Sequence, residues 1–278
     1  MRKDGKRVKN TEPMYALIPY IMPQRYDALN SVTVHLPYQP IHEYLMKKRK
    51  EGVRLSHMSL IIAAYLRCAA EYPLLNRFIM KKKIYAHNDF TVSMVVLRPG
   101  DMDGTMTKVS LEMTDTIFDV NRKIMEFLEQ NKAAQETNAT DTLMRRLLAV
   151  PGLVSAAVGL IKFADRHGLL PRKIIDASPF HCSLLISNLA SIRTNHIYHH
   201  IYEFGTAGVF ITMGNSIEKP EYDENGVVQL KRYIPCGVVM DERICSGSYF
   251  ARVFRRMQQY LNDPSLLEVP PETVAEDF

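Results

Sequence analysis

The sequence has few cysteines, no Cys-x-x-Cys pair and no long apolar stretch. Its four cysteines lie in apolar surroundings, as is typical of reduced, mostly buried thiols in an intracellular protein: Cys68, Cys182, Cys236 and Cys245. No apolar run reaches the roughly 20 residues that a membrane-spanning helix needs. Polar residues and a proline follow the basic start, so no secretory signal is visible. We therefore expect a cytoplasmic protein.

The excess of charge of either sign is also small. The formal net charge is +5 over 278 residues, and much of it lies in residues 1–12, which we expect to be a flexible, solvated start. No aromatic-basic motif accompanies this charge, so we expect no nucleic-acid partner, whereas a phosphate-rich ligand such as coenzyme A suits a mildly basic protein. The hydrophobic content of 46% is enough for a sizeable core, and we expect residues 13–278 to form a single domain.

The spacing of apolar side chains predicts a chain that mixes strands and helices. We expect strands and hairpins at 31–36, 78–87, 90–97, 98–111, 182–189, 208–214, 218–232 and 236–240. We expect helices at 41–51, 58–71, 116–131 and 249–261, with Ser56 as the N-cap of the second. The pattern indicates an α/β fold.

Residues 140–173 form an apolar segment, which we interpret as a helical insertion of two helices joined at Pro151 and Gly152. Three roles are open. The segment could cover the core or a neighbouring subunit, it could be a lid over an apolar substrate, or residues 143–170 could contact a membrane surface through basic flanks such as Lys162 and Arg166.

One polar motif stands between a strand-like and a helical segment. Residues 241–247 read Asp-Glu-Arg-Ile-Cys-Ser-Gly, and the following helix pattern ends near Asn262-Asp-Pro-Ser-Leu-Leu267. This arrangement resembles the C-terminal signature of the acyltransferase (E2) catalytic domain of 2-oxoacid dehydrogenase complexes, whose fold chloramphenicol acetyltransferase shares. The family pattern is Asp-His-Arg-x-x-Asp/Asn-Gly. This motif is degenerate, because Glu242 stands at the position of the catalytic His and Ser246 at the position of the Asp or Asn.

Two further segments resemble the same family in the same order. Residues 59–76 resemble its Ala-rich helix with a Pro-x-x-Asn turn, and residues 182–189 resemble its Thr-Phe-Thr-Ile-Ser-Asn-Leu strand. The resemblance implies a chloramphenicol acetyltransferase-like two-layer sandwich with a mixed β-sheet and packed helices. It also implies a homotrimer with sites at subunit interfaces, coenzyme A or acyl-CoA as co-substrate and a small-molecule acyl acceptor. It leaves open whether trimers build a larger cage.

The family also carries a lipoyl domain, which does not precede this segment, so we expect a stand-alone domain outside the dehydrogenase complexes. We expect no metal: His196 and His200 have the i, i+4 spacing of metal ligands on a helix, but no third ligand is evident.

The resemblance also assigns candidate catalytic residues. Ser187 falls on the serine that hydrogen-bonds the oxyanion of the tetrahedral intermediate. Glu242 would act as the general base, and His199 or His200 is a possible relocated base. A thiol has a pKa of about 8.5, a His about 6.5 and a Glu about 4.3, so proton transfer to an unperturbed Glu costs roughly 3 kcal/mol more than transfer to a His.

The charge partners of Glu242 decide between two functions. In the family the Asp or Asn pairs with an N-terminal arginine, for which Arg25 is the candidate, and Ser246 cannot replace that pairing. Glu242 therefore either pairs with Arg25 or Arg243 as a structural residue or remains an active base. The corresponding functions are an acyltransferase of altered chemistry, and a catalytically inactive trimeric scaffold or ligand-binding protein.

Overall fold

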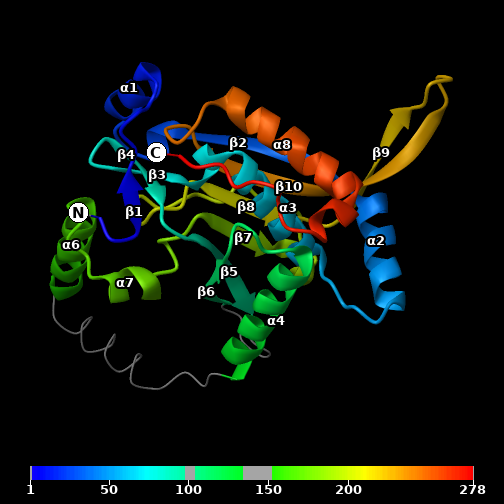
Figure 1. Ribbon diagram of the computed structural model, residues 1–278, viewed down its shortest axis with the longest axis horizontal. Helices are drawn as coiled ribbons and strands as arrows, with labels where there is room; N and C mark the ends of the chain where they lie inside the picture. Colours follow the sequence, from blue (N-terminus) through cyan, green and yellow to red (C-terminus); the bar gives the residue numbers. More distant parts are fainter. Residues whose placement is uncertain (1, 98–103, 134–151, 278) are drawn as a thin grey trace.

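A mixed β-sheet forms the centre of the molecule. The computed structural model describes residues 2–97, 104–133 and 152–277, and Figure 1 shows the arrangement of their helices and strands. Among these residues the strands of the large sheet are in the order β2-β10-β8-β7-β5-β6, with β9 paired to β10. The β5–β7 and β7–β8 pairs are parallel and the others antiparallel. The strands are β2 (Leu29–Pro37), β5 (Phe90–Leu97), β6 (Gly104–Leu111), β7 (Leu184–Asn188), β8 (Val209–Met213), β9 (Ile217–Tyr222) and β10 (Val228–Asp241).

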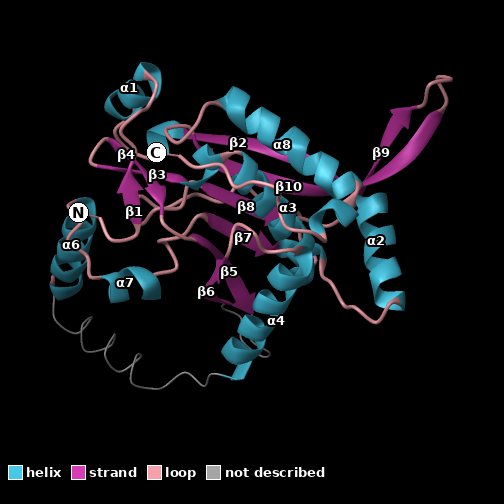
Figure 2. Ribbon diagram, viewed as in Figure 1, coloured by secondary structure: helices cyan, strands magenta, loops and turns pink. Residues whose placement is uncertain are grey.

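Helices α2, α3, α4 and α8 pack on this sheet and enclose the main core. Figure 2 shows helices and strands in different colours. The helices are α1 (Pro13–Ile21), α2 (Tyr38–Lys50), α3 (His57–Glu71), α4 (Ile117–Ala133), α6 (Leu153–Arg166), α7 (Arg172–Ala177) and α8 (Gly247–Asn262). Helix α3 is buried on every side from Ser59 to Ala70, which its small alanine side chains permit. Helix α8 instead buries one face, through Phe250, Val253, Met257 and Leu261 at helical spacing. The expected mixed sheet with packed helices is confirmed.

The opposite face of the sheet carries a smaller core and an extended crossing segment. Residues Leu185, Phe210 and Val239 point to this face, because successive side chains along a strand alternate between faces. Residues 195–204 cross over the sheet, and the carbonyl oxygen of Ile197 would lie 2.2 Å from a Cβ atom added at Gly237. Only glycine therefore fits at position 237 beneath this segment.

A second sheet of three strands incorporates the start of the chain. Its order is β1-β4-β3, formed by β1 (Gly5–Arg7), β3 (Arg77–Met80) and β4 (Lys83–His87), and Lys81 and Lys82 form the tight turn of the expected hairpin. The expectation that residues 1–12 are a flexible, solvated start is wrong for residues 2–8. Strand β1 pairs with β4, and Arg2 is buried in an ion pair with Asp165 at 2.5 Å.

The apolar insertion is described only in part. The second of the two expected helices is present as α6, with Gly152 as its N-cap at φ of 81°. The first expected helix and Pro151 lie outside the described residues, as do residues 98–103. Asp165 is the one buried residue of α6, whose apolar side chains include the exposed Leu160 and Phe163. None of the helices in the described ranges is both long and apolar enough to cross a membrane.

Candidate functional site

The polar motif forms the turn between β10 and α8. The backbone N–H of Asp241 donates to the carbonyl of Gly208, and that of Glu242 donates to the carbonyl of Ala28, both at 2.9 Å. Ser246 is the N-cap of α8: its hydroxyl accepts a hydrogen bond from the N–H of Tyr249 at 3.4 Å. The structure thus gives Ser246 a capping contact at the position where the family has an acid or amide.

Two arginines enclose Asp241 in the interior. Arg243 makes a two-pronged contact, from Nε to Oδ1 at 2.8 Å and from Nη2 to Oδ2 at 2.7 Å, and Arg25 approaches Oδ2 through Nε at 3.3 Å. All three residues are at most 2% exposed. Burial lowers the pKa of Arg25 from its ordinary value, and the nearby charge of Asp241 opposes that effect. Arginine keeps its proton in proteins, so the cluster carries two positive charges around one carboxylate.

Backbone oxygens and one acidic side chain balance this excess charge. Arg25 donates through Nη1 to the carbonyl of Tyr202 and through Nη2 to the carbonyl of Gly205 at 3.0 Å. The carboxylate of Glu203 accepts a hydrogen bond from the backbone N–H of Arg25 at 2.7 Å. The sequence analysis missed Glu203, because nothing in the sequence places residues 202–205 beside Arg25.

The hypothesis that Glu242 pairs with Arg25 or Arg243 is wrong. Both arginines bind Asp241, and in the described part of the chain the half-buried side chain of Glu242 has no hydrogen bond or ion pair. The reason is the local geometry of residues 242–244, which form a turn closed by a hydrogen bond from the N–H of Ile244 to the carbonyl of Asp241 at 3.2 Å. Within this turn Arg243 folds back onto Asp241, and its backbone N–H and its Nε both donate to Oδ1 of Asp241. A Cβ atom added at Gly247 would lie 3.3 Å from Oε1 of Glu242.

Ser187 lies near the end of β7, away from Glu242 within one chain. It pairs with Thr212 of β8, which pairs with Gly237 of β10, and Glu242 follows Gly237 by five positions. With about 3.3 Å per residue along a strand and about 4.8 Å between strands, Ser187 and Glu242 are separated by roughly 19 Å. Its hydroxyl has no hydrogen-bond partner among the residues described, and its side chain is partly exposed.

The two candidate histidines lie on the extended crossing segment. His199 packs its ring against Phe210 with centroids 4.5 Å apart, and His200 packs against Tyr202 at 4.8 Å. The i, i+4 spacing of His196 and His200 does not place them on one face of a helix, because residues 195–200 are not helical. Nowhere in residues 2–97, 104–133 and 152–277 do three His, Cys, Asp or Glu side chains gather as metal ligands would.

The four cysteines are free and buried, as expected. Cys245 lies within the motif, but burial raises the pKa of its thiol well above the ordinary value. Since the thiolate is the reactive form of cysteine, Cys245 is unsuited to nucleophilic chemistry.

Comparison with known proteins identifies the fold. The sequence matches no protein-family model, and a comparison with curated proteins also finds no match. The structure is similar to the cubic core of a pyruvate dehydrogenase multienzyme complex, with a TM-score of 0.59 and 12% identity over 93% of each chain. It is also similar to a probable dihydrolipoamide acetyltransferase from Listeria monocytogenes, with a TM-score of 0.58 and 13% identity over 91% of this chain and 94% of that one.

A chloramphenicol acetyltransferase gives a TM-score of 0.56 at 11% identity, over 92% of this chain and 99% of that one. The chain therefore has the fold of chloramphenicol acetyltransferase and of E2 catalytic cores, as the motif resemblance predicts.

Proposed function

We propose that this protein is an acyltransferase that accepts an acyl group from a thioester such as acyl-CoA and passes it to a small-molecule acceptor. Glu242 is the general base and Ser187 the oxyanion donor. The observation that carries this proposal is that Asp241 occupies both neighbouring arginines, which leaves the carboxylate of Glu242 without an ionic partner in the described structure. A carboxylate held in an ion pair would be a poorer base.

The reaction needs only proton transfer and charge stabilisation. Glu242 removes the proton from the acceptor hydroxyl or thiol, whose oxygen or sulfur attacks the thioester carbonyl. The hydroxyl of Ser187 donates a hydrogen bond to the oxyanion that forms. Collapse of this intermediate breaks the carbon–sulfur bond, and the departing thiolate takes the proton back from Glu242. Relative to a His, the carboxylate base is weaker by roughly 3 kcal/mol for proton transfer, so slow turnover is expected unless a second subunit shields the site from water.

The separation of Ser187 and Glu242 requires two copies of the chain. Roughly 19 Å between the two residues is too far for both to contact one reacting carbonyl, because strand spacing fixes their positions in the sheet. In the proposed homotrimer, Glu242 of one subunit faces Ser187 of the next. This arrangement agrees with the fold of the similar solved structures, one of which is the core of a multienzyme complex.

The experiment measures release of free coenzyme A from a series of acyl-CoA thioesters, with and without small hydroxyl and thiol acceptors. The wild type is compared with Glu242→Gln and Ser187→Ala, and Glu224→Gln on the exposed hairpin is the matched control. We expect loss of at least a hundredfold in kcat/KM for both site variants and none for the control. Thioester turnover that persists in both site variants would contradict the proposal.

A second function, a catalytically inactive trimeric scaffold or ligand-binding protein, is favoured by the cluster of Arg25, Asp241 and Arg243. This cluster joins distant segments of the fold and does so whether or not Glu242 acts as a base. The scaffold function predicts trimers in solution together with no turnover of any acyl-CoA by the wild type.

A further inference from the structure

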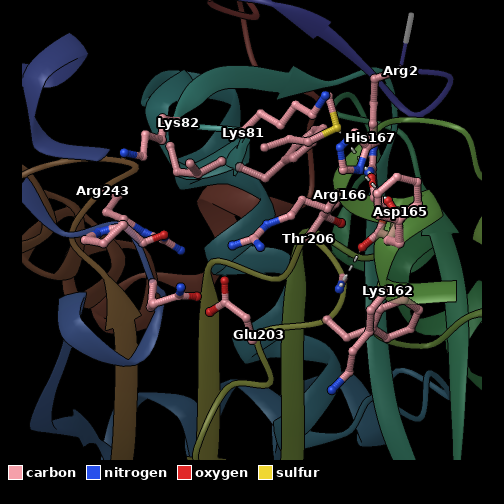
Figure 3. A pocket seen from close by; sticks show the side chains of 18 of the residues that line it. Arg2, Lys81, Lys82, Lys162, Asp165, Arg166, His167, Glu203, Thr206 and Arg243 are labelled. Atoms are coloured by element: carbon pink, nitrogen blue, oxygen red, sulfur yellow. Dashed lines mark hydrogen bonds and ion pairs between the residues drawn. The ribbon is translucent and has the colours of Figure 1, made fainter. Parts of the chain in front are cut away.

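A pocket lies between helix α6, the turn of the β3–β4 hairpin and residues 203–206. Its volume is about 830 Å³, which is within the range of about 300–1,000 Å³ typical of small-molecule sites. Apolar side chains form its walls: Phe78, Ile79, Met80, Phe163 and Phe204. Figure 3 shows this pocket with Arg243 on one side and Asp165 on the other.

Unpaired positive charge distinguishes the pocket from an ordinary apolar cleft. Lys81, Lys162 and Arg166 line it, and none of the three has an ion pair with a carboxylate among the residues that the structure describes. In Figure 3 the guanidinium of Arg166 projects into the middle of the pocket. Three cations gathered around one cavity repel one another, so a bound anion would relieve that repulsion.

The acidic groups of the pocket do not balance its cations. Asp165 binds Arg2 at 2.5 Å and lies 3.0 Å from Nε2 of His181, and it accepts a hydrogen bond from the N–H of Gly205 at 3.4 Å. Burial alone would raise the pKa of Asp165, but the hydrogen bond with His181 and the charge of Arg2 hold that pKa below its usual value. The carboxylate of Glu203 accepts a hydrogen bond from the backbone N–H of Arg25. Glu203 is therefore the one carboxylate of the described lining without an ion pair, against the three cations Lys81, Lys162 and Arg166, so the pocket keeps an excess of positive charge.

An unpartnered hydroxyl independently indicates a ligand. Thr206 lines the pocket and is 1% exposed, and its Oγ1 atom has no hydrogen-bond partner within the described structure. A buried polar group without a partner is costly, and such groups in folded proteins call for an explanation. Oγ1 itself is covered, so a polar head group in the pocket would supply the missing hydrogen bond once the Thr206 side chain rotates towards it.

We infer that this pocket binds an amphiphilic organic acid, with its anionic head near Arg166 and Thr206 and its apolar body against Phe163, Phe204 and Met80. Phe163 lines the pocket and its side chain is 55% exposed. An apolar ligand body that covers this aromatic ring would remove it from water. The inference does not depend on acyl transfer, since it assigns no role to Glu242 or Ser187.

The test is isothermal titration of the full chain with dodecanoate below its critical micelle concentration. Dodecanol has the same alkyl chain and no charge, so the difference in affinity between dodecanoate and dodecanol measures the contribution of the anionic head group. Inorganic phosphate has charge and no alkyl chain, so the difference in affinity between dodecanoate and phosphate measures the contribution of the apolar body. We expect dodecanoate to bind at least tenfold more tightly than either. Equal affinity for dodecanol or for phosphate would overturn the inference, and so would binding to phosphatidylglycerol vesicles without binding of monomeric dodecanoate.

Variants locate the binding to the pocket. The double variant Lys162→Gln with Arg166→Gln should weaken dodecanoate binding at least tenfold. The matched control, Lys47→Gln with Arg49→Gln on α2, carries the same change of charge at the other end of the molecule and should alter affinity less than twofold (Figure 1). Equal loss in both double variants would mean non-specific attraction and would contradict the inference.

A third variant separates binding from folding. Thr206→Val removes the unpartnered hydroxyl, so the free protein should melt at the same or a higher temperature, whereas dodecanoate should stabilise it less than it does the wild type. Glu242→Gln should bind dodecanoate with unchanged affinity, so failure of the acyltransferase proposal and failure of this one are distinguishable.

Discussion

Arg25 and Asp241 are 216 positions apart in the sequence and meet in a buried ion pair, with 3.3 Å between Nε and Oδ2. Arg243 completes the cluster from the other side of the carboxylate. The N-terminal segment is thereby fixed to the end of β10, next to the turn that carries Glu242. The cluster is a structural element that positions the candidate base.

Loss of Asp241 should destabilise the fold strongly. In Asp241→Asn two buried guanidinium groups lose their counter-charge, and removing one partner of a buried ion pair costs about 3–5 kcal/mol. The free energy of unfolding in urea measures the effect. Asp176→Asn is the matched control, because its pair with Arg172 is 53% and 43% exposed, and a surface pair contributes less than about 1 kcal/mol. Similar losses in the two variants would show that the cluster is not structural.

The crossing segment should not tolerate a side chain at position 237. In Gly237→Ala the new methyl group would lie 2.2 Å from the carbonyl oxygen of Ile197, so the segment must shift, and we expect a loss of about 3 kcal/mol in unfolding free energy. Gly159→Ala in helix α6 has open space around its added Cβ and should instead gain about 0.5–1 kcal/mol. Denaturant melts of the two variants measure both changes in unfolding free energy. An unchanged unfolding free energy in Gly237→Ala would contradict the close approach of Ile197 to Gly237.

The free energy of unfolding should decrease as the pH is lowered, because His87 is buried. Burial lowers the pKa of His87 to about 4, so between about pH 6.5 and pH 4 the unfolded chain binds a proton that the folded protein does not. The stabilisation is therefore complete above pH 6.5 and is lost as the pH falls towards 4, by roughly 3 kcal/mol at most.

The variant His87→Leu should show a flatter profile of unfolding free energy against pH over this interval. His200→Leu, at an exposed position, is the control and should keep the wild-type slope. An unchanged slope in His87→Leu would mean that His87 is protonated in the folded protein.

Mixed oligomers provide the sharpest test of a site shared between subunits. Co-expressed Glu242→Gln and Ser187→Ala chains would combine an intact Ser187 from one chain with an intact Glu242 from the other, so random mixing should restore about a quarter of the sites. Thioester turnover of the mixture, compared with each variant alone, is the measurement. A site confined to one chain would stay inactive in the mixture.

The sequence was sufficient for most elements of the fold and for the location of the motif. Local patterns such as the buried alanines of α3, the Ser56 cap and the Lys81–Lys82 turn depend on neighbours in the chain, and they were predicted correctly. The start of the chain was not predicted correctly, because the burial of Arg2 depends on Asp165, which lies 163 positions away. Composition alone indicated a solvated start. The pairing of β1 with β4 and the ion pair of Arg2 with Asp165 bury part of this segment, and neither can be seen in the local sequence.

The catalytic roles of the candidate residues stay predictions, and the contacts of the motif were not predicted from the sequence. Arg25 contacts the motif, but it binds Asp241 and not Glu242, because residues 242–244 form a turn in which Arg243 folds back onto Asp241. The pocket beside α6 was not predicted. Its lining comes from segments far apart in sequence, and the orphan hydroxyl of Thr206 becomes visible only once the fold encloses it.

An arginine anchors the chain near each end of the described structure. Near the N-terminus Arg2 forms an ion pair with Asp165. Near the C-terminus Arg77 donates to the carboxylate of Asp277 through Nε and Nη2, at 2.5 and 2.6 Å. Affinity tags for the experiments above therefore belong on flexible linkers. Proteolytic trimming that removes Arg2 would leave Asp165 of α6 with only His181 and Gly205 as buried partners among the described residues, and would loosen the helix that forms one wall of the pocket.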